Sequence, residues 1–452
     1  MCPQVFESVL VANRGEIASR ITRTVRGLGL KAVAVHSDAD ADLPFVHEAD
    51  EAVLIGPSAP AQSYLDARSV LEAARRHNAR AVHPGYGFLA ENAGFARAVE
   101  AAGLAWVGPP PLTIARLGDK INARNLMKEA GVPVAPGVWE PVPDTETALE
   151  EAARIGYPVM VKAASGGGGI GMGVAHDEAR LRAVYPAARS RAEMFFASPD
   201  VMLERFVRGA RHVEVQVIGR PDGSVVALGD RECSVQRRHQ KIVEEGPAPG
   251  LPEGMRARLH LAAVRAAEAV GYRGAGTVEF LLDPVSGEFY FVEMNARLQV
   301  EHPVTEMLTG VDLVEQQLRV AAGERVSFRG VRSRGHAIEL RVYAEDPFRF
   351  APRPGRIRVW EEPVGPGIRI DAGYAEGNSV TPYYDPLLAK LVVHGDTRDA
   401  ALARARAAVA AFRIEGTLTT NLPFLAELLD NPEFVSGRYD TGIVGRMRPA
   451  SN

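Results

Sequence analysis

The sequence predicts an α/β protein of about three domains, the first of them built on a parallel sheet. The chain has 452 residues, and domains commonly hold about 150. Over residues 6–107, short apolar runs alternate with helix-like segments, and such alternation gives parallel sheets with right-handed crossovers. The hydrophobic fraction of 46% and the charged fraction of 24% fit a globular protein with substantial cores.

The first domain is predicted over residues 1–117. Its first strand, FESVLVAN, ends at Asn13, and a helix follows with apolar residues at helical spacing over residues 17–28. The strand KAVAVHS comes next, and then ARAVHP and LAWVGP, each after a helix-like segment. Because residues 13–16 read NRGE and do not open a G-x-G-x-x-G loop, dinucleotide binding is poorly supported.

Two further domains are predicted, over residues 118–331 and 332–447. The first boundary follows VGPPP at residues 107–111, where the alternation gives way to a helix with basic residues and then to a Pro-rich stretch. The central domain holds the strand PVMVKAA, a glycine loop, a helix over residues 255–270 and the strands GTVEFLL and EFYFVEMN. The last domain holds the strand HAIELRVYAED and the helical stretch DAALARARAAVAAF.

A glycine-rich loop, SGGGGIGMG, occupies residues 165–173, directly after a strand that contains Lys162. Dense glycines let the backbone approach a ligand and point N–H groups at it, and a lysine before the loop can neutralise phosphate charge. The loop is not a Walker A motif, since no G-x-x-x-x-G-K-[ST] occurs. The pattern predicts a phosphate-binding loop, with a flexible linker as the alternative.

The strands GTVEFLL and EFYFVEMN are separated by DPVSG, a turn sequence, and so predict a hairpin. In the simplest register the opposed pairs are Asp283 with Phe289, Leu281 with Phe291, and Glu279 with Glu293. Two directly opposed carboxylates destabilise a sheet unless a cation compensates them. Oxygen ligands of this kind suit Mg²⁺. The alternative is a solvated polar face in another register.

Side chains alternate between the two faces of a strand, so Asn295 and Arg297 are predicted to share the face of Glu293. Arg297 can hold a planar anion through two hydrogen bonds. Glu301, which follows shortly, is a candidate general base. His302 is a candidate catalytic group, although a histidine packed for structural reasons is the more common case.

The run RRHQK at residues 237–241 concentrates basic side chains between two Gly- and Pro-punctuated segments. It is consistent with an anion pocket or with a solvated charged face. Cys233 lies close to these cations, which would lower the pKa of its thiol. An inert buried cysteine is the more common case.

Composition excludes several classes of function. The net charge of -4 argues against a general nucleic-acid-binding surface, and the chain has no apolar run long enough to span a membrane. The two cysteines, Cys2 and Cys233, cannot form a disulfide framework, which favours a reducing compartment. The start of the chain does not read as a signal or transit peptide, and a cytoplasmic location is therefore expected.

These motifs together resemble biotin carboxylase, the ATP-grasp enzyme that carboxylates biotin in acyl-CoA carboxylases and related enzymes. The resemblance is carried by VANRGEIA, HPGYGFLAEN at residues 83–92, VKAASGGGGIGMG, GDRECSVQRRHQK, EMNARLQVEHPVTEMLTG, HAIELRVYAEDP and YYDPLLAKL. It runs from about residue 6 to about residue 446. It implies an α/β (α+β) ATP-grasp fold with an N-terminal Rossmann-like domain, a mobile glycine-loop lid at about residues 135–205 and a C-terminal biotin carboxylase domain.

The resemblance also implies which residues form the site. ATP would be bound by Lys120, Lys162, Gly168, Gly169, Glu204, Arg205, Phe206, Val207, His212, Gln236, His239, Glu279 and Glu293. The implied ligands of Mg²⁺ or Mn²⁺ are Glu279, Glu293 and Asn295. The catalytic set would be Arg297, Glu301, Lys241 and Arg341.

Substrate roles follow from the same resemblance. Lys241, Arg297 and the backbone of Val300 would hold bicarbonate, and Glu301 would act as the base. Arg341 would stabilise the biotin enolate, and Tyr86 would form part of the wall on the biotin side. Two positions depart from the family pattern, because Ile170 stands where a basic residue is common and Ser165 where a further glycine is common. These departures are expected to affect the rate of the reaction and not whether the reaction occurs.

The implied reaction is ATP- and bicarbonate-dependent carboxylation of biotin through carboxyphosphate, as the first half-reaction of an acyl-CoA carboxylase. No biotin-bearing segment is evident, since Met127-Lys128 lacks a second methionine, so biotin would arrive on a carrier protein. A homodimer and a carboxyltransferase partner are further implied. The alternatives are a component of a pyruvate or urea carboxylase, another ATP-grasp ligase such as a carboxylate–amine ligase, and a nucleotide-binding regulatory protein.

Overall fold

The first region of the chain forms the predicted parallel sheet. All four strand pairings are parallel, in the order β3-β2-β1-β4-β5. The computed structural model describes residues 6–138, 140–164, 172–196, 198–328 and 330–449. The elements of this region are β1 (Ser8–Val11), α1 (Gly15–Gly27), β2 (Lys31–Ser37), α2 (Pro44–Glu48), β3 (Glu51–Gly56), α3 (Ala67–Arg76), β4 (Ala81–His83), α4 (Ala93–Ala101) and β5 (Ala105–Trp106), followed by α5 (Pro111–Gly118) and α6 (Lys120–Glu129).

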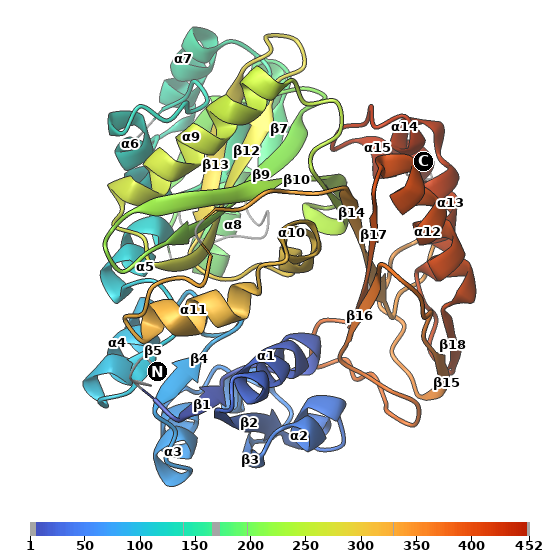
Figure 1. The fold of residues 1–452 in the computed structure, drawn as a ribbon. Coiled ribbons are helices and arrows are strands. Elements are labelled where there is room, and N and C mark those ends of the chain that lie inside the picture. Colours follow the sequence, from blue (N-terminus) through green and yellow to red (C-terminus); the bar gives the residue numbers. More distant parts are fainter. Residues whose placement is uncertain (1–5, 139, 165–171, 197, 329, 450–452) are drawn as a thin grey trace.

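A second sheet has eight strands, in the order β13-β12-β9-β10-β11-β14-β17-β16. Figure 1 shows it running from the central region into the C-terminal region. Its strands are β9 (Arg211–Gly219), β10 (Val225–Arg237), β11 (Gln240–Gly246), β12 (Gly274–Leu282), β13 (Phe289–Asn295), β14 (His336–Tyr343), β16 (Ile368–Ala372) and β17 (Leu387–Gly395).

This sheet crosses the boundary that the sequence places between residues 331 and 332. Strand β11 pairs antiparallel with β14, and Glu244 lies opposite Glu339 in that pairing. The last two regions therefore share one hydrogen-bonded sheet. Apolar periodicity within each strand cannot reveal such a pairing, because it depends on which strand edges meet.

The predicted hairpin is present, with a correction to its register. Glu279 lies opposite Glu293, as predicted, but near the turn Phe291 pairs with Phe280 and Phe289 with Leu282. The predicted pairs of Phe291 with Leu281 and of Phe289 with Asp283 are therefore wrong. The register shifts by one residue between Glu279 and Phe280, as in a β-bulge. This shift brings the two carboxylates face to face despite the different turn.

A separate three-stranded sheet, β7-β6-β8, lies within the segment that was predicted to form a lid. It packs with two helices around its own apolar cluster, which includes Val161, Leu181 and Leu203. Its elements are α7 (Thr145–Ile155), β6 (Val159–Ala163), β7 (Gly173–Ala175), α8 (Glu178–Phe196) and β8 (Val201–Arg205). This cluster is distinct from the two large cores that hold the rest of the molecule together.

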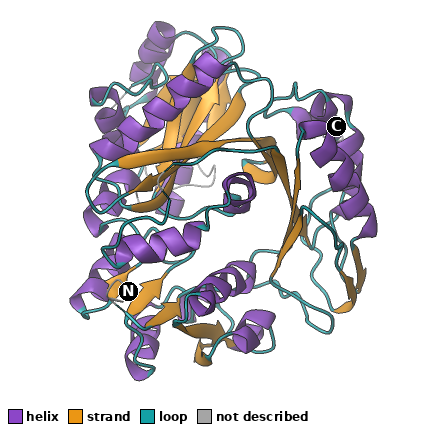
Figure 2. Cartoon of the chain, in the orientation of Figure 1, coloured by secondary structure: helices purple, strands orange, loops and turns teal. Residues whose placement is uncertain are grey.

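Helices cover the outer sides of the eight-stranded sheet (Figure 2). The remaining elements are α9 (Glu253–Ala269), α10 (His302–Thr309), α11 (Leu313–Ala321), β15 (Ile357–Glu361), α12 (Arg398–Ala411), β18 (Arg413–Gly416), α13 (Leu422–Asp430), α14 (Pro432–Val435) and α15 (Ile443–Met447). Within the described part of the chain, no helix has the length and apolar character needed to cross a membrane.

Candidate active site

Charged residues form a row across the eight-stranded sheet. Glu293, Glu279, Glu214 and Arg231 lie directly opposite one another on the neighbouring strands β13, β12, β9 and β10. Glu214 and Arg231 are fully buried, and Glu279 is 5% exposed. Buried ionised groups are stable only when paired and hydrogen-bonded, so this row marks a specialised site and not a solvated face.

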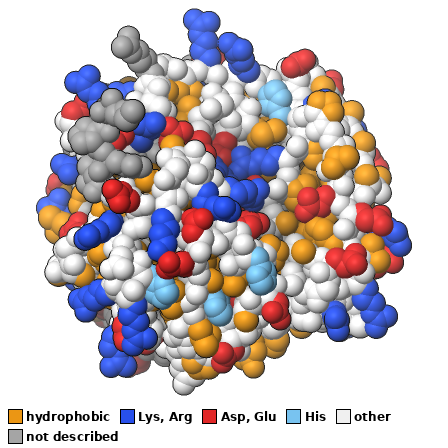
Figure 3. All heavy atoms as spheres, turned by 60° about the horizontal axis from the view of Figure 1, so that its bottom comes forward, with side chains coloured by type: hydrophobic (Ala, Val, Ile, Leu, Met, Phe, Trp, Pro, Cys, Tyr) orange, Lys and Arg blue, Asp and Glu red, His pale blue; other side chains and the backbone are white. Residues whose placement is uncertain are grey.

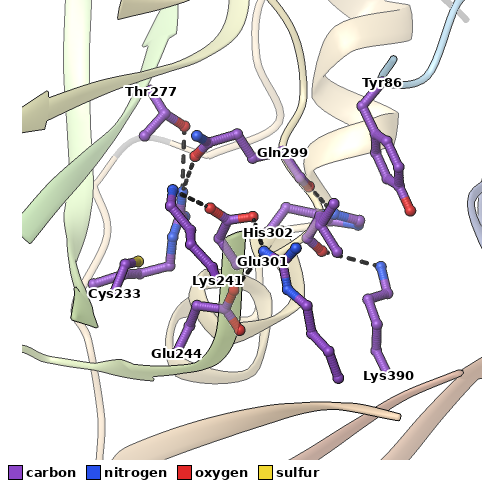
Figure 4. Close-up of polar contacts among 12 residues, drawn as sticks. Tyr86, Cys233, Lys241, Glu244, Thr277, Gln299, Glu301, His302 and Lys390 are labelled. Carbon is purple, nitrogen blue, oxygen red and sulfur yellow. Dashed lines mark hydrogen bonds and ion pairs between the residues drawn. The ribbon is translucent and has the colours of Figure 1, made fainter. Parts of the chain in front are cut away.

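Lys241 lies at the centre of this site. Its Nζ is 2.5 Å from Glu214 Oε2, 2.5 Å from Glu301 Oε1 and 3.0 Å from Glu279 Oε1. Figure 4 shows Lys241 facing Glu301, with Cys233 to its left in the view. One ammonium group thus joins carboxylates from β9, from β12 and from the residue immediately before α10.

The turn between β10 and β11 places Lys241. Arg237 pairs with Gln240, which leaves a two-residue turn of Arg238 and His239 with φ values of 49° and 68°. Both residues adopt the left-handed conformation of a type I′ hairpin. The next pair, Gln236 and Lys241, lies in the site. The basic run therefore forms the turn that positions Lys241 in the site, which favours an anion pocket over a solvated charged face.

Glu301 lies between two cations, immediately before α10. Its Oε1 pairs with Lys241, and its Oε2 lies 2.9 Å from Arg341 Nη2. Although burial opposes ionisation, Lys241, Arg341 and Arg231 hold the pKa of Glu301 well below its usual range. The carboxylate is therefore ionised at neutral pH.

Arg341 also contacts Glu244, which faces Glu339 across β11 and β14. Both glutamates are fully buried. Burial and the nearby Glu301, against the effect of Arg341, raise the pKa of Glu244 to about 7. Burial also raises the pKa of Glu339. Two buried carboxylates this close cannot both ionise at little cost.

Arg231 holds several site residues in place, and the sequence analysis did not find it. Its Nε donates to Glu214 at 2.6 Å, and its Nη2 donates to Gln299 at 3.0 Å. Gln299 in turn donates to Glu279 Oε1 at 2.7 Å. Hydrogen bonds from Arg231 and Gln299 therefore hold the site carboxylates in position, and some of the hydrogen bonds of Arg231 are drawn in Figure 4.

The residues predicted to bind a metal lie together. Asn295 Nδ2 donates to Glu279 Oε1 at 2.9 Å, and Glu279 faces Glu293. Among the described residues, the Glu293 carboxylate forms no hydrogen bond or ion pair, and burial and Glu279 raise its pKa. A divalent cation would relieve this repulsion, so the donor set fits Mg²⁺ or Mn²⁺.

His212 adds a nitrogen donor next to these carboxylates. Its Nε2 lies 3.0 Å from Glu279 Oε2, and its Nδ1 lies 2.9 Å from Gln236 Nε2. Burial disfavours the charged form of His212, but the effect of Glu279 is larger and raises the pKa of His212. His212, Glu214 and Glu279 are spaced closely enough to hold one ion between them.

Several predicted nucleotide-binding residues meet where the small sheet faces the large one. Glu204 forms ion pairs with Lys162 and Arg124, and although burial opposes it, these cations lower its pKa to about 2. Burial lowers the pKa of Lys120, and burial and the nearby Lys162 lower the pKa of His239.

The remaining predicted nucleotide-binding residues are less informative. Arg205, the last residue of β8, is exposed, and after it Phe206 is half-buried and Val207 is buried. Gly168 and Gly169 lie outside the described residues, as do Ile170 and Ser165. The glycine loop itself therefore stays a prediction.

The predicted anion-binding residues lie beside Glu301. Arg297 donates from Nη2 to Asn295 Oδ1 at 2.8 Å and from Nε to Glu91 at 2.9 Å. The Val300 carbonyl accepts a hydrogen bond from Lys390 at 3.1 Å. Figure 3 shows Lys and Arg side chains gathered with acidic ones around a hollow on one face of the molecule.

Tyr86, predicted for the biotin side, is held by the turn after β1. Asn13 Nδ2 donates to the carbonyls of Pro84 and Tyr86, both at 2.7 Å, and the Tyr86 hydroxyl donates to Glu16. Gly85 has a φ of +64°, and a Cβ there would lie 2.8 Å from Asn13 Nδ2. The NRGE and HPGYG motifs thus pack against each other.

Two open alternatives from the sequence are decided by burial. His302 is fully buried and its Nδ1 lies 2.8 Å from the Gln299 carbonyl, which favours the structural role. Cys233 is fully buried, and burial and Glu214 raise the pKa of its thiol. The lowered pKa is therefore wrong and the inert cysteine is the better description.

The fold and this site define an ATP-dependent ligase of the ATP-grasp class, with carboxylates for a metal and cations for phosphate and a small anion. Family models match three consecutive segments. "Biotin carboxylase, N-terminal domain" matches residues 5–114, "Carbamoyl-phosphate synthase L chain, ATP binding domain" matches 119–328, and "Biotin carboxylase C-terminal domain" matches 339–446.

Relatives of known activity match over nearly the whole chain. A biotin carboxylase of Pseudomonas aeruginosa is 49% identical over 96% of this chain and 96% of its own length. Biotin carboxylase 2 of Bacillus subtilis is 47% identical over 97% of this chain and 98% of its own. A crystal structure of a biotin carboxylase–β,γ-ATP complex from Campylobacter jejuni has a TM-score of 0.95 and 42% identity over 98% of this chain and 99% of that one.

The chain belongs to the biotin carboxylase family. The predicted ATP-grasp fold, the ligase activity and the resemblance drawn from the motifs are thereby confirmed. Family members work with a biotin carrier and a carboxyltransferase, and a biotin carboxylase domain dimer from Hydrogenobacter thermophilus matches with a TM-score of 0.93 and 42% identity over 98% of this chain and 97% of that one.

Proposed function

We propose that this chain transfers a carboxyl group from bicarbonate to biotin on a separate carrier protein, with ATP as the energy source and Mg²⁺ or Mn²⁺ as the metal. The observation that carries the proposal is the position of Glu301, whose two carboxylate oxygens contact Lys241 and Arg341. A base between two fixed cations suits deprotonation of an anion whose negative charge must be stabilised.

Glu301 would take the bicarbonate proton, and the freed oxygen would attack the γ-phosphoryl group of ATP to give carboxyphosphate and ADP. Lys241, Arg297 and the backbone N–H of Val300 would hold the anion, and lysine and arginine side chains of the site would neutralise charge on the transferring phosphoryl group. Lys162, Lys120 and His239 would bind the nucleotide phosphates.

Glu279, Glu293 and Asn295 would hold the metal, which screens negative charge on the phosphates when it is bound. The raised pKa of Glu293 beside Glu279 supports this assignment. It also predicts that removing the metal leaves two opposed carboxylates competing for a proton.

Carboxyphosphate would release CO₂ and phosphate, phosphate would remove the ureido proton of biotin, and the ureido nitrogen would attack CO₂ to form carboxybiotin. Arg341 would turn from Glu301 toward the biotin oxygen, whose negative charge it would stabilise. Tyr86 lies on the neighbouring turn, where the ring of biotin would pack. The small β7-β6-β8 sheet, with its own core, would close over the nucleotide and keep carboxyphosphate from water.

The final acceptor and the partners are part of the proposal. We favour an acyl-CoA carboxylase, with a homodimer of this chain, a separate carrier and a carboxyltransferase. A pyruvate carboxylase component of Methanothermobacter thermautotrophicus is 46% identical over 98% of this chain and 90% of its own length, so a pyruvate system is the alternative. The domains over residues 1–117, 118–331 and 332–447 and the cytoplasmic location belong to the same proposal.

The test is ADP release by the purified chain with Mg-ATP, measured with and without bicarbonate and with and without free biotin. We expect release to require bicarbonate and to rise with biotin. ADP release that depends on neither bicarbonate nor biotin would contradict the proposal and indicate another ATP-grasp ligase. ATP binding without any release would indicate a regulatory protein.

A further inference from the structure

Two buried side chains outside the proposed catalytic set hold the backbone just before Glu301. His302 Nδ1 lies 2.8 Å from the carbonyl of Gln299, and Lys390 Nζ lies 3.1 Å from the carbonyl of Val300. Both side chains are fully buried. They therefore contact the two successive peptide groups that connect Gln299, Val300 and Glu301.

The chemistry of the first contact fixes the form of the histidine. A carbonyl oxygen only accepts hydrogen bonds, so the His302 Nδ1 must carry the proton. Burial and nearby cations such as Lys390 hold the pKa of His302 well below its usual range. His302 is thus a neutral donor with a single function, since its Nε2 has no hydrogen-bond partner among the described residues.

The second contact ties the peptide to the rest of the molecule. Lys390 lies on β17 and pairs with Glu16 Oε2 at 2.8 Å, at the start of α1. Asp371 lies farther from its Nζ, at 3.8 Å, and pairs with Arg369 at 2.7 Å. A buried ammonium group needs close oxygen partners, and its close ones are Glu16 and the Val300 carbonyl. Figure 4 shows Lys390 and Lys241 on opposite sides of Glu301.

In a planar trans peptide the carbonyl and the following N–H point in opposite directions. Holding the Gln299 carbonyl therefore sets the direction of the Val300 N–H. Holding the Val300 carbonyl likewise sets the backbone from which the Glu301 side chain extends. The group proposed to bind the anion and the proposed base are adjacent, so both depend on these two contacts.

We propose that His302 and Lys390 are positioning residues that lock these two peptides, so that the Val300 N–H and the Glu301 carboxylate act on one bound anion. The inference rests on the proposed bicarbonate site and adds the residues that give it its geometry. Small displacements of a reacting group can cost about 100-fold in rate, so the lock bears directly on function.

The test compares His302→Leu, which removes the donor, with His302→Asn, whose amide can replace the Nδ1 hydrogen bond. In His302→Leu we expect the KM for bicarbonate to rise about 10-fold or more while the KM for ATP changes less than about 2-fold. His302→Asn should recover most of the loss. Equal rises in both KM values, or no difference between Leu and Asn, would overturn the proposal.

Lys390→Met tests the second contact, with Arg398→Met as the matched control. Arg398 also pairs with a buried glutamate of the same sheet, Glu245, but within the described part of the chain it has no contact with the peptides before Glu301. Both variants should lose stability, and only Lys390→Met should raise the KM for bicarbonate selectively. A selective rise in Arg398→Met as well would attribute the effect to general loosening and overturn the proposal.

Hydrogen–deuterium exchange of residues 297–302 gives a readout that needs no activity. Exchange in this segment should be faster in His302→Leu and Lys390→Met than in the starting protein and in Arg398→Met. Unchanged exchange would overturn the proposed positioning role of His302 and Lys390, whether or not the starting protein releases ADP. If the starting protein shows no bicarbonate-dependent release but exchange responds as expected, the proposed function fails and the positioning role stands.

Discussion

Glu244 and Glu245 are neighbours on β11 whose side chains point to opposite faces of the sheet. Glu245 has every oxygen satisfied, by His336 at 2.5 Å, by Arg398 at 2.7 and 2.9 Å and by Tyr439 at 2.6 Å. Among the described residues, Glu244 has an ion pair with Arg341 only, and it faces Glu339. Both glutamates are fully buried.

The pKa values of the two groups diverge accordingly. Although burial opposes it, His336 and Arg398 lower the pKa of Glu245 to about 2, whereas burial raises the pKa of Glu244 to about 7. A cluster that serves the fold satisfies its charges completely, whereas the cluster around Arg341 leaves charge unbalanced. Arg341 pairs with both Glu244 and Glu301 and lies near Glu339, so carboxylates outnumber the cation there, and shifted pKa values of this kind are common at functional sites.

The largest effect expected from this contrast is in the cluster around Arg341, which includes Glu301 and lies on the face of the sheet that we call the catalytic face. Glu301→Gln should lower bicarbonate-dependent ADP release by about 10³-fold, since general base catalysis contributes about 10²–10⁴-fold. Lys241 keeps Glu214 and Glu279 as partners and Arg341 keeps Glu244, so the melting temperature should fall less than in Glu245→Gln. A variant that retains more than a tenth of the rate would show that Glu301 is not the base.

On the opposite face, Glu245→Gln should lower the free energy of unfolding by about 3 kcal/mol, because it leaves Arg398 without its buried partner. Urea denaturation would measure the loss. The kcat per folded molecule should stay within about 2-fold of the starting value. A large loss of kcat without loss of stability would contradict the division between the two faces.

Arg341→Ala separates the two half-steps on the catalytic face. Carboxylation of free biotin should fall by about 100-fold, as expected for loss of a charge-stabilising donor. ADP release without biotin should fall less, because Lys241 still contacts Glu301. An unchanged rate of biotin carboxylation would show that Arg341 does not stabilise the enolate.

The smallest effect expected is on pH dependence, where the two glutamates should differ in sign. The lowered pKa of Glu245 gives stability that is present above about pH 4.5 and lost as pH falls toward 2, whereas the raised pKa of Glu244 costs stability as pH rises from about 4.5 to 7. As pH rises from 5 to 8, the melting temperature of Glu244→Gln should therefore increase relative to that of the starting protein.

The deficit of Glu245→Gln should stay constant over the same range, since the pKa of Glu245 lies below it. Melting temperatures at several pH values for the two variants and the starting protein would check both expectations. Parallel curves for Glu244→Gln and the starting protein would mean that Glu244 does not titrate there.

The sequence predicted the strands and motifs better than the contacts between them. The opposition of Glu279 and Glu293 followed from one hairpin, because both strands lie close together in the chain. Near the turn the register was wrong, since no residue in EFYFVEMN signals the extra residue of a bulge.

Glu214 and Arg231 were missed, although a signal existed. His212, Glu214 and Gln216 alternate along β9 and are all buried, and polar residues at a period of two in an otherwise apolar strand indicate a functional face. Lys390 offered no such signal. Its partners Glu16 and Val300 lie far away in the sequence, and only the assembled fold brings them together.

The pairing of β11 with β14 has a consequence for how the chain can be divided. A chain ending near residue 331 would keep β11 but lose β14, and would expose an edge of unpaired N–H and C=O groups in the middle of its largest sheet. Open edges of this kind pair with other chains and aggregate. Exchange of the C-terminal part between relatives therefore succeeds only where the new β14 matches the old β11.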